Sequence, residues 1–164
     1  MGYIDKNLMS EEEIIYTAKI HWFIYLPPLF WLVVGLLLVS VNADNADSAP
    51  MRDFQPYFAP VGILLIIFAA IKFIGAWITR STTELGITTK RVIAKFGLIR
   101  RDTVELNHSK VESFIVGQSI LGRIFDFGTL IIQGTGGGQT PIRAVDSPLT
   151  FRKEAMQVID KTCG

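Results

Sequence analysis

The chain has 164 residues, of which 49% are hydrophobic and 19% are charged, and its formal net charge is +1. A mean hydropathy of +0.37 is too high for an ordinary soluble domain, while the charged fraction is too high for a chain lying wholly in lipid. We therefore expect a membrane part and an aqueous part. The one cysteine, Cys163, excludes an intramolecular disulfide and a cysteine-based metal cluster.

The N-terminal part, residues 1–79, predicts an amphipathic helix followed by a two-helix membrane hairpin. Ser10 and Glu13 have the spacing of a capping box, so we expect a helix that begins near Ser10 and leads into the first span. Pro27 and Pro28 should kink this helix or mark the place where it changes direction.

Two apolar stretches have the length that a bilayer crossing needs, roughly 20 helical residues. Residues 21–41 contain no Lys, Arg, Asp or Glu, and residues 58–78 are interrupted only by Lys72. Residues 42–57 would form the connecting loop. The alternative, two buried helices of a soluble core, is disfavoured because so short a chain has little other mass to cover both.

Basic residues near the span ends predict the orientation. The loop carries Arg52 against three aspartates, whereas basic residues flank the hairpin on its outer ends. They are Lys6 and Lys19 before the first span and Arg80, Lys90, Arg91 and Lys95 after the second. Both termini should therefore lie in the cytoplasm.

Lys72 is the single charge inside a span. It could line an ion or substrate path, which would make the chain a subunit of a channel or transporter. We favour the alternative that its long stem reaches toward the headgroups, because two spans with one charge make a poor transporter.

The C-terminal part, residues 80–164, changes to short β-rich runs separated by turn residues. Apolar and polar residues alternate around Leu85–Ile87 and Val104–Leu106, and further runs occupy Val92–Phe96, Val111–Val116, Leu130–Gln133 and Ile142–Val145. Ser147 and Pro148 then start a helix whose apolar residues fall at helical spacing. These are Leu149, Phe151, Ala155, Met156, Val158 and Ile159. The pattern predicts an α+β protein: two membrane helices, then a strongly bent antiparallel sheet or barrel capped by a C-terminal helix.

Residues 134–138 read GTGGG, which raises the question of a phosphate-binding loop. Such a loop needs a helix directly after the glycines, but residues 139–142 read as another strand and no Lys-Ser/Thr pair ends the glycine segment. We therefore predict a hairpin turn.

Three segments carry a family resemblance. They are ITTKRVIAKFGLIRR at residues 87–101, LNHSKVESFIVGQSILGRIFDFGTL at residues 106–130, and the closing helix. With the two spans and the acidic start, they resemble the membrane-flanked, type 2 form of the bacterial pleckstrin-homology (PH) domain family. The resemblance covers nearly the whole chain. It implies a PH-like fold, a bacterial inner-membrane location and no catalytic role.

Eukaryotic relatives of this fold often bind phosphoinositides through a basic motif on the first hairpin. Here the nearby basic residues do not have the spacing of that motif, although they remain a candidate lipid or partner contact site. They are Lys90, Arg91, Lys95, Arg100 and Arg101. Residues 80–164 hold 12 basic against 8 acidic residues, a net charge of +4 that would favour an anionic leaflet.

The sequence contains no residue pattern typical of a catalytic, metal-binding or cofactor-binding site. His21 and His108 are far apart, with no metal-ligand or Ser-His-Asp spacing, and basic residues are not interleaved with aromatics as nucleic-acid binding needs. We predict a non-enzymatic interaction or scaffold module at the membrane, homo-oligomeric, with protein and lipid partners. The alternatives are lipid-headgroup sensing by the first hairpin and a channel or transporter subunit.

Overall fold

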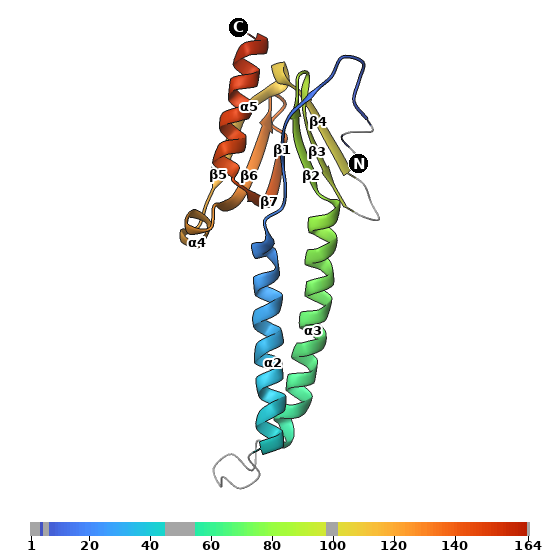
Figure 1. Ribbon diagram of the computed structural model, residues 1–164, viewed down its shortest axis with the longest axis vertical. Helices are drawn as coiled ribbons and strands as arrows, with labels where there is room; N and C mark the ends of the chain where they lie inside the picture. The colour runs from blue at the N-terminus through green and yellow to red at the C-terminus, as the bar shows by residue number, and fades with distance from the viewer. Residues whose placement is uncertain (1–3, 5–6, 45–54, 98–101, 164) are drawn as a thin grey trace. The chain divides into compact units, whose positions relative to one another are not determined.

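The computed structural model describes residues 4, 7–44, 55–97 and 102–163 (Figure 1). The chain divides into two compact units. One, here called the sheet unit, joins Met1–Phe23 to Thr79–Gly164, and the other, the helical unit, is Ile24–Ile78.

The helical unit consists of α2 (Leu26–Asp44) and most of α3 (Gln55–Thr82). Both helices are long and apolar enough to span a membrane, as the sequence predicts. A short 3-10 turn, η1 (Trp22–Tyr25), precedes α2. Pro27 and Pro28 therefore lie in the first turn of α2, where a missing N–H is tolerated, and they mark the start of the helix rather than a kink within it. Residues 45–54 of the predicted loop lie outside the described residues.

Two glycines let α2 and α3 approach each other closely. A Cβ at Gly35 would lie 2.9 Å from the carbonyl oxygen of Gly62, and a Cβ at Gly62 would lie 2.8 Å from the carbonyl oxygen of Gly35. Small residues at such a crossing let helix backbones pack by van der Waals contact, which is the main attraction available to helices in lipid.

The first sheet of the sheet unit contains β1 (Ile14–Ala18), β2 (Glu84–Thr88), β3 (Arg91–Phe96) and β4 (Asp102–Asn107), in that order and antiparallel. The predicted N-terminal helix near Ser10 is wrong, because Ile14–Ala18 is a strand that pairs with β2. Its β-branched sequence IIYTA suits a strand, and pairing with β2 satisfies its backbone groups. The predicted boundary at residue 80 therefore separates two neighbouring strands.

The second sheet has the order β5-β6-β7. A 3-10 turn, η3 (His108–Lys110), leads into β5 (Val111–Gly117); α4 (Ile120–Ile124) follows, and then β6 (Phe127–Gly134) and β7 (Gln139–Asp146). The GTGGG segment connects β6 to β7, with Gly137 at a φ of 75° and the amide of Gly134 donating to the carbonyl of Gly138 over 3.0 Å. The prediction of a hairpin turn is confirmed.

The described strands form two antiparallel sheets, and no closed barrel is found among them. The expected α+β class is confirmed, but the single bent sheet or barrel is not, because the ladder breaks between β4 and β5 at η3. One isolated bridge, Ile20 to Val145, joins the segment after β1 to β7 of the second sheet.

The C-terminal helix α5 (Pro148–Cys163) packs on the sheets within the sheet unit (Figure 1). Phe151 is fully buried, with its ring 5.9 Å from that of Tyr16 and 6.3 Å from that of Phe114. Ala155 and Val158 are buried on the same face. This helix starts where the sequence predicts.

Candidate functional site

The structure describes three of the five basic residues predicted as a contact site; Arg100 and Arg101 lie outside the described residues. The Nζ atom of Lys90 donates to the carbonyl of Ser10 over 2.9 Å, and the Nζ of Lys95 lies 3.6 Å from a carboxylate oxygen of Glu84. Arg91 is only 6% exposed. Its guanidinium therefore faces the protein interior, and lipid binding by this hairpin stays a prediction for the other residues.

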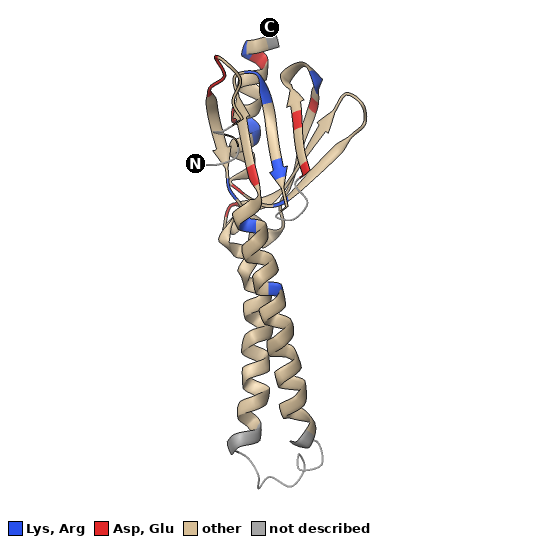
Figure 2. Ribbon diagram, turned by 90° about the vertical axis from the view of Figure 1, so that its right-hand side faces the viewer, with Lys and Arg blue, Asp and Glu red and all other residues tan. Residues whose placement is uncertain are grey.

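Basic and acidic residues are interleaved along the strands, whereas the two long helices carry almost no charge (Figure 2). The three described basic residues near the first hairpin accordingly have acidic or carbonyl partners from other elements. This arrangement reduces the attraction that a net positive charge alone would suggest.

Arg91, the first residue of β3, donates side-chain hydrogen bonds to three other residues. Its Nε and Nη2 atoms donate to the two carboxylate oxygens of Glu12, each over 2.9 Å. Nη1 donates to Glu105 on β4, and Nη2 also donates to the carbonyl of Asn7 over 2.9 Å. A planar guanidinium matches a carboxylate in this paired geometry, which gives stronger hydrogen bonds than a single contact.

Glu12 is the middle residue of the run Glu11–Glu13, and it alone of the three is buried. Glu11 has a φ of 63°, and this left-handed turn directs the next side chain inward. The Glu12 carboxylate also accepts from the amide of Met9 and from the hydroxyl of Thr88, both over 2.7 Å. All the hydrogen-bonding needs of a buried carboxylate are thus met by the chain itself.

The charges of this pair stabilise each other. Burial by itself raises the pKa of Glu12, but the hydrogen bonds from Arg91, the Met9 amide and Thr88 outweigh it and hold that pKa below its ordinary value of 4.5. The hydrogen bond to Glu12 raises the pKa of Arg91, against the opposing effect of burial. Both groups are therefore charged at neutral pH. Their hydrogen bonds hold residues 7–12 against β3.

His108 is 3% exposed and is connected to this pair through Thr88, whose hydroxyl donates to Glu12. Its Nε2 is 3.0 Å from the carbonyl oxygen of Thr88, and within the described part of the chain its Nδ1 has no hydrogen-bond partner. A proton on Nε2 lets this nitrogen donate to the Thr88 carbonyl. The described contacts of Glu12, Arg91 and Thr88 join parts of the chain that are distant in sequence, which is typical of a cluster that stabilises the fold.

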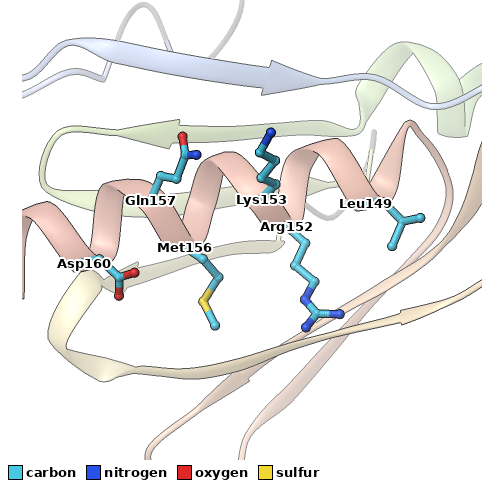
Figure 3. Close-up of a pocket in the computed structure, with 6 residues that line it drawn as sticks. All are labelled: Leu149, Arg152, Lys153, Met156, Gln157 and Asp160. Carbon is cyan, nitrogen blue, oxygen red and sulfur yellow. The ribbon is translucent and has the colours of Figure 1, made fainter.

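The outer face of α5 offers a different kind of surface (Figure 3). A hollow of about 390 Å³ runs along it, lined by Leu149, Arg152, Lys153, Met156, Gln157 and Asp160. Lys153 and Gln157 point to one side, and Arg152 and Met156 point to the other (Figure 3). Leu149 and Met156 are exposed, although the sequence pattern placed them with the core residues. Exposed apolar residues between charges on one helix face are typical of a contact surface.

A second hollow of about 220 Å³ adjoins the first along α5, and Gln157 lines both. Ile15 of β1 and Thr89 of the β2–β3 turn contribute its opposite wall. Together the two hollows extend over both sides of the exposed helix surface.

Sequence reasoning missed both features, for different reasons. The signal for Glu12 is only an acidic run, and which of three glutamates turns inward depends on the strand that it meets. For α5, Met156 and Leu149 flank the core stripe of Phe151 and Val158, so that helical spacing alone gives one broad apolar face. Among the described residues, no group of three or more His, Cys, Asp or Glu side chains is placed to hold a metal ion.

The family comparison agrees with this architecture. No curated protein and no solved structure shows a significant match to the chain. The family model described as "Bacterial PH domain" matches residues 28–161, which include nearly all of α2, all of α3, strands β2 to β7 and nearly all of α5; β1 lies before the matched range. Because this match covers most of the chain, the protein belongs to the bacterial PH domain family.

Proposed function

We propose that this protein is a non-enzymatic interaction module of the bacterial inner membrane whose PH domain brings copies of the chain together. Two helices that can span a bilayer would anchor it, with both termini in the cytoplasm as the distribution of basic residues predicts. The observation that carries the proposal is the exposed, partly apolar face of α5.

The α5 face is complementary to itself. Arg152 and Asp160 each lie four residues from Met156, on opposite sides along the helix. In an antiparallel pair of α5 helices related by a two-fold axis at Met156, each Arg152 would meet the partner's Asp160. The two Met156 side chains would meet at the axis, between the two ion pairs. A two-fold interface requires this reciprocity, since the same patch serves both subunits.

The individual contacts are weak, and the membrane anchor would compensate for that. Exposed ion pairs contribute about 0.2–1 kcal/mol each, and a methionine contact adds a modest apolar term. Confinement to one membrane raises the effective concentration of copies, so a weak interface suffices. A different protein partner would use the same face by packing an apolar side chain against Leu149 and pairing an acidic side chain with Arg152.

Cysteine crosslinking in native membranes tests this proposal. The variant carries Met156→Cys in a Cys163→Ser background, so that a disulfide-linked dimer reports contact at the axis. Arg152→Asp alone and Asp160→Arg alone should each reduce the dimer, because like charges then face each other. The two changes together should restore it.

The matched control is Arg143→Asp, which makes the same charge change at an exposed position of β7. This control should leave the dimer unchanged. The proposal fails if Met156→Cys gives no dimer in membranes, or if the double charge exchange does not recover what the single changes remove.

A further inference from the structure

A second exposed apolar surface lies in the short segment between β5 and β6, which contains α4. Four side chains of this segment are exposed although all are large and apolar. Ile120 is 80% exposed and Ile124 68%, with Leu121 and Phe125 about half exposed. We call Ile120, Leu121, Ile124 and Phe125 the α4 patch.

The α4 patch is held in a fixed shape. Ser119 caps the helix by accepting from the Gly122 amide over 3.1 Å. Gly122 is needed there, because a Cβ would lie 2.5 Å from the carbonyl oxygen of Phe127. Asp126 turns the chain back with a φ of 54°, and its carboxylate accepts from the hydroxyl of Ser147 over 2.7 Å. The surrounding contacts thus present the apolar side chains outward instead of letting them fold onto the core.

The patch is continuous with the chain segment that enters the first apolar helix. The ring of Phe125 lies 5.6 Å from that of Phe23 and 6.3 Å from that of Trp22. Phe23 also stacks on Phe127 at 4.1 Å. Trp22 is the first residue of the candidate span, and α2 begins at Leu26. If the span is in the bilayer, Phe125 is therefore one aromatic ring away from the point where the chain enters it.

We propose that the α4 patch inserts into the headgroup region of the same membrane that anchors the helices. This inference rests on the membrane location in the proposed function. Trp22 has the ring chemistry that favours this zone, and the apolar side chains next to it gain by leaving water. Arg123, exposed within the same segment, can pair with anionic lipid phosphates while its neighbours insert. The patch would attach the PH domain to the lipid surface directly, in addition to the covalent connection of the domain to the two spanning helices.

Depth-dependent quenching on the full-length protein tests the inference. The chain is reconstituted in vesicles of phosphatidylcholine and phosphatidylglycerol, at no more than one chain per vesicle. An environment-sensitive fluorophore is attached through Ile124→Cys in a Cys163→Ser background. Ile124 is exposed, so its replacement should not disturb folding. Lipids with a nitroxide near the headgroup should quench this probe roughly twofold or more.

Two further positions make the result decisive. Gly136→Cys places the probe in the β6–β7 turn, which has open space around it, and should show little quenching. Ile67→Cys places it in the middle of α3 and should be quenched by nitroxides deep in the bilayer. An Ile124 probe that behaves like the Gly136 probe, while Ile67 is quenched, overturns the inference and leaves the anchored interaction module standing. An unquenched Ile67 probe overturns both.

Dilution separates lipid from protein contact. Quenching at Ile124 should be the same at low and high protein density. A probe that is shielded only when copies are crowded, without nitroxide quenching, would assign the α4 patch to a second chain and overturn the inference.

Discussion

Replacing Glu12 by alanine should destabilise the sheet unit far more than the same change at the adjacent Glu13. Removing the Glu12 carboxylate leaves the Arg91 guanidinium inside the protein, with Nε and Nη2 deprived of their two bonds to it. It also leaves the Met9 amide without its side-chain acceptor, while the Thr88 hydroxyl keeps only the carbonyl of Arg91. Glu13 is exposed, so its carboxylate can be removed without leaving a buried charge.

The size of the effect follows from this geometry. Breaking a buried ion pair by removing one partner costs about 3–5 kcal/mol, because the remaining charge stays buried and unpaired. Arg91 keeps its bonds to Glu105 and to the carbonyl of Asn7, which places the expected loss near the lower end, about 3 kcal/mol. For a domain of roughly 100 residues, this corresponds to a fall in Tm of about 10 °C or more. Glu13→Ala should change stability by at most about 0.5 kcal/mol.

The assay is thermal unfolding of the full-length protein in mild detergent, followed by near-ultraviolet circular dichroism and size-exclusion chromatography. A double variant, Glu12→Leu with Arg91→Met, separates the loss of contact from the burial of a lone charge. It removes both charges and should therefore recover much of the stability that Glu12→Ala loses.

Equal stabilities of Glu12→Ala and Glu13→Ala would refute the reasoning. A Glu12→Leu/Arg91→Met double variant that is no more stable than Glu12→Ala would refute it as well. That result would mean that the unpaired buried charge is not the source of the lost stability.

Three other predictions concern the pH response and the helices. Because the folded-state pKa of Glu12 lies below 4.5, its contribution is complete above about pH 4.5 and is lost as the pH falls through the folded-state value; an acid titration of unfolding should therefore be flatter in Glu12→Gln. Gly35→Leu should separate the two long helices and destabilise the hairpin by about 1–3 kcal/mol, while Gly75→Leu, where the space is open, should be tolerated in the same detergent-stability assay. The Nζ of Lys72 lies 5.4 Å from the ring centroid of Phe68. Replacing Lys72 by leucine should leave the amount of protein in the membrane unchanged, and vesicles should show no ion flux with either residue. An ion flux that the replacement abolishes would favour a channel subunit.

The predicted elements that depend on chain-local signals agree with the structure. The apolar stretches give α2 and α3 because length and hydropathy are properties of the segment itself. Ser147 and Pro148 start α5, and the GTGGG segment forms a hairpin turn, since turn and cap residues act over a few positions. The family, too, is readable from short motifs and their order along the chain.

The N-terminal segment shows where local signals fail. The capping-box spacing of Ser10 and Glu13 favours a helix, but Ile14–Ala18 becomes a strand because β2, some 70 positions away in the chain, offers it a free edge. A strand is stabilised by its partner, and the partner is known only when the chain is folded. The same is true of Glu12, whose burial depends on Arg91 of β3.

The sequence by itself determined the two apolar helices, the rough positions of β2 to β7, the closing helix and the family. Each of these follows from hydrophobic periodicity, turn chemistry or segment length, which act within a few residues. Only the tertiary structure decided that the basic residue Arg91 faces inward, that residues 14–18 join the sheet, and that Met156 and the α4 patch face outward. These outcomes depend on contacts between segments distant in the chain, where pairing and packing, rather than local preference, fix the lowest free energy.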